Sequence, residues 1–264
     1  MNKSLLYVLV TTVSFISCAD SYSVQGTSSI ASLDGSKLYL KAVKSGELKN
    51  IDSCDVVHGQ FHFTGLLDTV RMANLFMDDE GLMPVVLEKG DINIHIDYAS
   101  RRVSGTPLNE ELYDFLNRHD QLGNEMSELS HKHSQMLLEG EDEQSINEQL
   151  NIEAARIAQQ EDSLVTNFIV DNFDNVLGPG VFMMMTGSFP YPVLTPQIED
   201  IMSKATKTFK NDPYVREYYQ VAQENEQRMN GLSESASAPQ TPAAPVDTMA
   251  SKAPAAPLVN MPKP

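Results

Sequence analysis

Cys54 is the residue whose side chain could carry covalent chemistry within the folded part of this chain. The chain holds two cysteines, and the other, Cys18, lies at the end of an N-terminal apolar run. Asp52 and Asp55 flank Cys54, and nearby carboxylates raise the pKa of a thiol and disfavour the reactive thiolate. A lone cysteine forms neither a Cys-x-x-Cys couple nor an internal disulfide. We therefore interpret Cys54 as a small strand residue and keep a reactive free thiol as the alternative.

The six histidines and the many acids raise the question of a metal site. A metal ion needs three or four converging ligands, whereas His62 and His95 are expected on outward faces of strands. His131 and His133 stand two residues apart in a helical stretch, so they do not share a helix face. The acidic run 139–143 lacks the alternating ligands of a calcium loop and fits a solvated helix start. We expect no metal ligand, no cofactor-binding residue and no catalytic residue.

The N-terminus has the pattern of a secretory signal. Lys3 precedes the apolar run 5–16, which as a helix would rise only ~18 Å, too short for a ~30 Å hydrocarbon core. Its end, Phe15-Ile16-Ser17-Cys18, resembles a bacterial lipobox. The resemblance implies that 1–17 is a signal peptide and that Cys18 carries diacylglycerol on its sulfur. Ordinary cleavage after Ala19 is the alternative, because Ser17-Cys18-Ala19 is also a small-x-small site.

A lipid on Cys18 would anchor the mature protein to a membrane from outside the inner membrane, at ~0.8 kcal/mol per buried CH₂. We therefore expect a lipoprotein of the cell envelope whose first partner is the membrane. Residues 19–22 lack an acidic cluster of the kind that resembles a surface-export signal, so we expect the protein to face the periplasm.

The charge balance excludes several functions. The chain has 19 Lys+Arg against 36 Asp+Glu, a formal net charge of −17. Nucleic-acid binders neutralise phosphates with basic groups, so this acidic chain is not expected to bind nucleic acid. The same charge balance argues against electrostatic docking on an anionic membrane. A protein partner remains open.

The region after the signal has the alternation of antiparallel strands. In the stretch 91–97, Ile92, Ile94 and Ile96 alternate with polar residues, and Phe61 and Phe63 share one face of an earlier strand with His62 on the other. Short strands with glycine at the turns predict a small antiparallel β-sandwich or curled sheet over 22–107.

From residue 108 the period changes to that of helices. Two apolar stripes, 108–136 and 146–168, break at Gly140, which predicts an antiparallel helical hairpin. His119 and His133 fall on its seam, where polar residues specify register. The stretch 108–175 holds sixteen acids and three bases, a net of −13.

The rest of the predicted helical region, 108–230, contains a break and two further helices. The Gly-Pro-Gly stretch 178–180 is expected to end the hairpin unit. The three methionines at 183–185 are interpreted as core or a soft partner surface rather than a copper site. Helices are expected over about 196–208 and 213–229. The fold class is therefore α+β.

The segment 231–264 is rich in alanine, proline and serine, and it holds seven of the 14 prolines. Such a composition buries too little apolar surface to offset its ordering entropy. We expect a disordered tail with some polyproline II character.

The β region resembles the N-terminal β domain of unknown function in lipoproteins of Bacteroidetes-type bacteria. In that family a helical segment and a thioredoxin-like domain follow. The matching pieces are Val24-Gln25-Gly26, Leu33-Asp34-Gly35, Leu38-Tyr39-Leu40, Ile51-Asp52-Ser53, Gly59-x-Phe61-x-Phe63-x-Gly65, Leu87-Glu88-x-Gly90-x-Ile92 and Gly105-Thr106-Pro107-Leu108-Asn109. Phe168-Ile169 and Asn172 are similar to the helical segment of that family.

The thioredoxin-like domain, with its Cys-x-x-Cys, should begin near residue 230. The Ala/Pro-rich stretch stands there instead, so the resemblance carries over no catalytic residue. We expect a lipid-anchored, non-enzymatic binding or assembly protein. The alternative is an accessory to thiol–disulfide exchange that acts with a redox partner in trans. An acidic cation-binding module is the third hypothesis.

Overall fold

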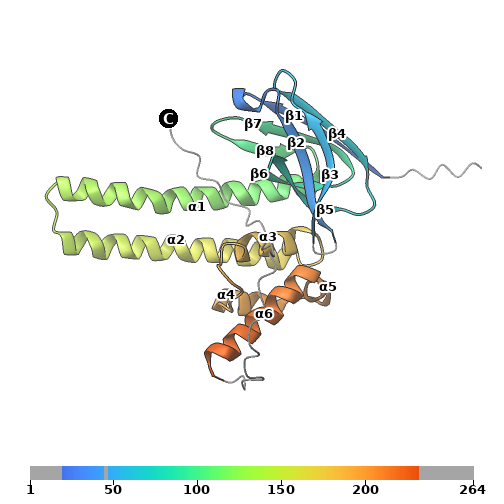
Figure 1. The fold of residues 1–264 in the computed structure, drawn as a ribbon. Helices are drawn as coiled ribbons and strands as arrows, with labels where there is room; N and C mark the ends of the chain where they lie inside the picture. Colours follow the sequence, from blue (N-terminus) through green and yellow to red (C-terminus); the bar gives the residue numbers. More distant parts are fainter. Residues whose placement is uncertain (1–19, 45–46, 232–264) are drawn as a thin grey trace, which may run out of the picture.

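The computed structural model describes residues 20–44 and 47–231, which form a β-sandwich, a long helical hairpin and a group of shorter helices (Figure 1). Cys18, the predicted signal peptide and the predicted tail from residue 232 onward lie outside the described residues. The strands are β1 (Ser21–Ser28), β2 (Lys37–Lys44), β3 (Glu47–Asp55), β4 (Gln60–Leu66), β5 (Arg71–Met77), β6 (Glu80–Leu87), β7 (Gly90–Ile96) and β8 (Arg101–Ser104). The helices are the 3₁₀ helix η1 (Ala31–Leu33), α1 (Pro107–Leu138), α2 (Glu143–Asp171), α3 (Leu177–Thr186), α4 (Pro196–Lys204), α5 (Lys207–Asn211) and α6 (Pro213–Met229).

The sandwich consists of two four-stranded sheets with the orders β4-β1-β7-β8 and β3-β2-β5-β6. Alternate residues of β1, β2, β4 and β7 face inward, as the sequence predicted, so Ile92, Ile94 and Ile96 are buried while Asn93 and His95 are exposed. They belong to the same core as Leu40 and Leu75 of the opposite sheet. The predicted α+β class is confirmed.

One strand pair departs from the predicted antiparallel pattern. β1 and β7 are parallel, with Tyr22 opposite Gly90 and Ser28 opposite Ile96. The chain returns to β1 only after five intervening strands. Local alternation predicts that a strand exists, but it does not identify the strand beside it.

Two glycines of the first sheet lie beneath aromatic rings. A β-carbon on Gly26 would stand 2.0 Å from the ring of Phe61, its cross-strand neighbour. One on Gly65 would stand 2.5 Å from the hydroxyl oxygen of Tyr22, also its cross-strand neighbour. The glycines let each ring lie flat across the adjacent strand and cover it. These contacts give a physical reason for Gly26 and for the Gly65 of the Gly59-x-Phe61-x-Phe63-x-Gly65 pattern.

Helices α1 and α2 form an antiparallel hairpin, called the arm below, that projects from the sandwich (Figure 1). Leu122 and Ile157 are buried along its seam, as the apolar stripes predicted. Met136, Ile146 and Leu150 form a separate small core near its far end. The turn between the helices uses Gly140 in a left-handed conformation, φ 84°.

Polar pairs also cross the seam of the arm. His119 Nε2 lies 3.1 Å from Glu161 Oε1, and Lys132 Nζ lies 2.6 Å from Glu153 Oε2. His119 and His133 are both half-buried, in agreement with their predicted place on the seam. These contacts fix which residues of α1 and α2 face each other.

The Gly-Pro-Gly stretch 178–180 was predicted to end the hairpin unit. Instead α2 ends at Asp171, and the stretch lies inside the next helix, α3. Pro179 stands in the first turn, where a missing backbone N–H leaves no helical bond unmade. A β-carbon on Gly178 would stand 2.4 Å from the carbonyl oxygen of Asn172, and one on Gly180 would stand 2.8 Å from Met72. Here glycine permits close packing of a helix, and the three methionines belong to that helix.

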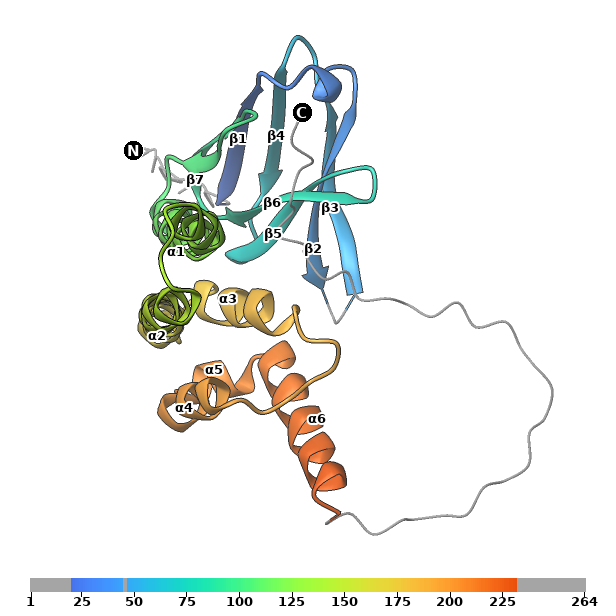
Figure 2. The ribbon, with the colours of Figure 1, turned by 90° about the vertical axis from the view of Figure 1, so that its left-hand side faces the viewer.

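Helix α3 lies between the sandwich and helices α4 to α6 (Figure 2). The first of the two predicted C-terminal helices is divided into α4 and α5 around Ala205 and Thr206, and the second, α6, has the predicted bounds. Thr195, Thr206 and Asp212 cap the three N-termini with their side chains.

Candidate functional site

Cys54 is half-buried in the edge strand β3, beside strand β4. The pKa of its thiol is raised to about 11, first by burial and then by the charges of Asp52 and Asp55, while a backbone hydrogen bond from His62 and the charge of Lys37 oppose the shift. The prediction that the flanking acids raise this pKa is confirmed, although burial has the larger effect. The neutral thiol is a poor nucleophile.

We expect Cys54 to react slowly. In the Cys18→Ala variant, alkylation of folded protein at pH 8 should be about 100-fold slower than in denaturant, because the thiolate fraction falls tenfold per pKa unit. Because the pKa is higher in the folded state, the protonated thiol contributes to the free energy of unfolding. This contribution is fully present below pH 9.0 and is lost as the pH rises through about 11. Equal alkylation rates for folded and unfolded chain would contradict the assignment.

The outward edge of β6 is closed by side chains from β8 and α1. Three alternate carbonyls of β6 point outward, and each accepts a hydrogen bond. Leu82 O accepts from Arg101 at 2.6 Å, Pro84 O from the Tyr113 hydroxyl at 2.9 Å and Val86 O from Asn109 Nδ2 at 2.7 Å. Asn109 Oδ1 also accepts the backbone N–H of Val86 at 2.8 Å. Because unpaired strand edges invite pairing with other chains, these bonds protect β6.

Glu88 fixes the start of the arm on this edge. Its Oε1 accepts the backbone N–H groups of Leu108 and Asn109 at 2.9 and 3.1 Å, in the first turn of α1. A carboxylate is favoured there by the unpaired amides and the helix dipole. Two of the motif pieces, 87–92 and 105–109, therefore meet in space and join the sandwich to the arm. We call this set of contacts the junction.

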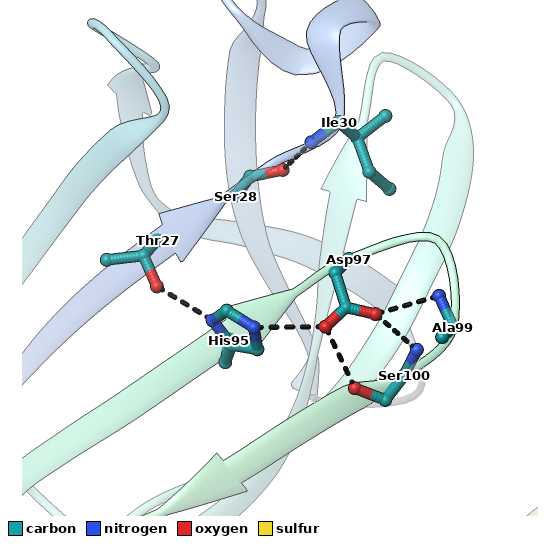
Figure 3. Close-up of polar contacts among 7 residues, drawn as sticks. All are labelled: Thr27, Ser28, Ile30, His95, Asp97, Ala99 and Ser100. Atoms are coloured by element: carbon teal, nitrogen blue, oxygen red, sulfur yellow. Dashed lines mark hydrogen bonds and ion pairs between the residues drawn. The ribbon is translucent and has the colours of Figure 1, made fainter.

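A chain of hydroxyl, imidazole and carboxylate groups lies on the outer face of the first sheet (Figure 3). Thr27 Oγ1 is 3.0 Å from His95 Nδ1, and His95 Nε2 is 3.1 Å from Asp97 Oδ2. In enzymes such a chain can activate the hydroxyl as a nucleophile. Thr27 was not singled out in the sequence, because the contact depends on the parallel β1–β7 register.

The surroundings of this chain indicate a structural role. Asp97 also accepts the backbone N–H groups of Ser100 and Ala99 at 2.6 and 2.7 Å, and these bonds hold its pKa below the ordinary value. Its carboxylate therefore shapes the turn between β7 and β8. The side chain of His95 is 55% exposed, so water surrounds the imidazole. We interpret the contacts as cross-strand bonds that stabilise the sheet edge and its turn.

A cleft of about 330 Å³ is lined by residues of β2, β3 and β4 and of the loop that follows β4. Lys44, Lys49 and Arg71 contribute three positive charges to its lining, and Asp68, which pairs with Arg71, contributes one negative charge. Tyr22 and Asn50 add uncharged polar groups. Burial and then Asp52 raise the pKa of Tyr22, although Arg71 opposes the shift, so its hydroxyl keeps its proton at neutral pH. The arrangement can accept an anion in an otherwise acidic chain.

The structure also places the histidines and acids that the sequence raised as possible metal ligands. In the part of the chain that the structure describes, no group of three or more His, Cys, Asp or Glu side chains could hold a metal ion. Nor does any helix in the described ranges have the length and apolar character needed to cross a membrane.

A model of a protein family, described as a domain of unknown function (DUF4369), matches residues 22–112. The matched stretch contains the sandwich and the first turns of α1, including Glu88 and Asn109 of the junction. The expectation of an N-terminal domain of unknown function is thereby confirmed at that level. Searches of curated proteins and of solved structures gave no match.

Proposed function

We propose that this protein is a lipid-anchored, non-enzymatic component of the cell envelope that holds a protein partner through its arm. The anchor is the predicted lipid on Cys18, on the periplasmic face. The observation that carries the proposal is the arm itself, which extends well beyond the sandwich that bears it (Figure 1).

The arm is longer than the part of it that packs against the sandwich (Figure 1). Its helices of 32 and 29 residues are each roughly 45 Å long at 1.5 Å per residue. At its far end Leu138 is 89% exposed and Leu137 42% exposed, and Ile152 is 68% exposed farther along α2. Exposed apolar side chains on a projecting element favour contact with another protein.

The negative charge of the arm favours a partner with a positively charged surface. Residues 108–175 carry a net charge of −13, most of the −17 of the whole chain. A partner with a basic surface would be attracted to this field and would associate faster at low salt. We therefore propose a basic protein with an apolar pocket that accepts the end of the arm.

The test is capture of partners from the native envelope by the intact lipoprotein, compared with a Leu137→Ser/Leu138→Ser variant. The matched control is Tyr98→Ser, which removes another exposed apolar side chain, 73% exposed, from the sandwich. We expect a basic partner that wild type and control retain and that the arm variant loses, with no change in melting temperature. Equal capture by all three proteins would contradict the proposal, and a partner released only by reducing Cys54 would favour the redox alternative.

A further inference from the structure

Asp20, the first described residue, is fixed to one end of the sandwich. Its carbonyl oxygen accepts the backbone N–H of Leu67 at 2.7 Å, and its carboxylate lies 2.6 Å from Lys89 Nζ. Only Ala19 stands between Asp20 and Cys18. Consecutive Cα atoms are 3.80 Å apart, so the Cα of Cys18 lies within ~8 Å of that of Asp20.

We call this end of the sandwich, formed by Asp20, Leu66–Arg71, Lys44, Lys49 and Lys89, the anchor end. Leu66 stands opposite Ser21 in the first strand pair and is 78% exposed. Val70, in the following loop, is 39% exposed. Such side chains can enter the interfacial layer of a bilayer.

The cationic cleft opens at the same end. Leu66 and Leu67 line it together with Lys44 and Lys49. Lys49 pairs with Glu47 at 3.3 Å, but its side chain is still 48% exposed, and exposed ion pairs contribute little. A phosphate can therefore compete for the lysine. Asp20, Glu47 and Asp68 also lie at this end, and each of them is paired with a cation of the anchor end.

We propose that the anchor end rests on the bilayer, with the phosphate of an anionic phospholipid headgroup in the cleft and with Leu66 and Val70 in the interfacial layer. The proposal rests on the lipid anchor of the proposed function. Because Ala19 alone separates the fixed Asp20 from Cys18 in the sequence, lipid chains on Cys18 would draw this end against the headgroups. The cations then meet phosphates within the Debye length of ~8 Å.

The test is fluorescence quenching in lipidated protein reconstituted into vesicles of phosphatidylcholine and phosphatidylglycerol that contain spin-labelled lipid. A fluorophore is attached to Leu66→Cys or Val70→Cys in a Cys54→Ser background whose melting temperature has been checked. The matched controls are Tyr98→Cys, ~25 Å away at the opposite end of the strands, and Leu138→Cys on the arm. We expect most of the fluorescence to be lost at 66 and 70 and little to be lost at 98 and 138.

A second comparison tests the cleft. Lys44→Glu/Lys49→Glu should reduce quenching at position 66 on the anionic vesicles to its level on pure phosphatidylcholine. An unchanged signal would overturn the headgroup site. Another outcome is that the lipidated protein co-floats with the vesicles while a fluorophore at position 66 is quenched no more than one at 98 or 138. That result would contradict the docking of the anchor end but not the lipid anchor. If the protein does not float, the anchor and the docking are both wrong.

Discussion

Replacement of Cys18 by alanine is expected to release the protein from the membrane completely and to prevent processing by the lipoprotein peptidase. The thioether to diacylglycerol needs the Cys18 sulfur, and two acyl chains at ~0.8 kcal/mol per CH₂ supply the anchoring free energy. Membrane fractionation and the intact mass of the mature chain measure both effects.

Ser17→Ala is the matched control, because it keeps a small residue before the cysteine. It should leave membrane retention and mature mass unchanged. If cleavage instead follows Ala19, wild type and Cys18→Ala will share a mature chain that begins at Asp20, and both will be soluble. Unchanged retention of Cys18→Ala on membranes would exclude lipid attachment at this residue.

The sandwich and the arm could be predicted because their patterns are local. Ile92, Ile94 and Ile96 alternate with polar residues, and the arm repeats apolar residues at helical spacing. These periods report which face of an element is buried. Helix α3 was missed because the two glycines of 178–180 normally interrupt a helix, and their close contacts with Asn172 and Met72 cannot be read from sequence.

The contacts that join distant segments could not be predicted. Thr27 and His95 meet only because β1 and β7 are parallel neighbours. Glu88 and Asn109 are 21 residues apart and belong to different elements. Both residues stand in pieces that match the family in the sequence, but only the structure shows that they contact each other. Cys54 was correctly interpreted as a strand residue, yet its burial, which dominates its pKa, came from the packing of β3 beside β4.

Replacement of Asn109 by alanine is expected to destabilise the protein more than any other helical asparagine substitution. Asn109 is fully buried and satisfies both backbone groups of Val86 and the hydroxyl of Thr106. Alanine has the higher helix propensity, so a loss of stability must come from the broken tertiary bonds. Each buried group left unpaired costs about 1–3 kcal/mol, so the two backbone groups of Val86 together cost about 2–6 kcal/mol.

At roughly 2–4 °C per kcal/mol for a protein of this size, the melting temperature should fall by about 10 °C. Asn147→Ala, an exposed asparagine in the interior of α2, is the control and should leave the melting temperature unchanged or slightly higher. The substitution also uncovers the edge of β6, so the Asn109→Ala protein should aggregate more readily on heating. Because Asn109 lies in the first turn of α1, hydrogen exchange should accelerate first at Val86 and in that turn. A decrease in melting temperature no larger than that of the control would show that the side-chain hydrogen bonds of Asn109 do not stabilise the junction.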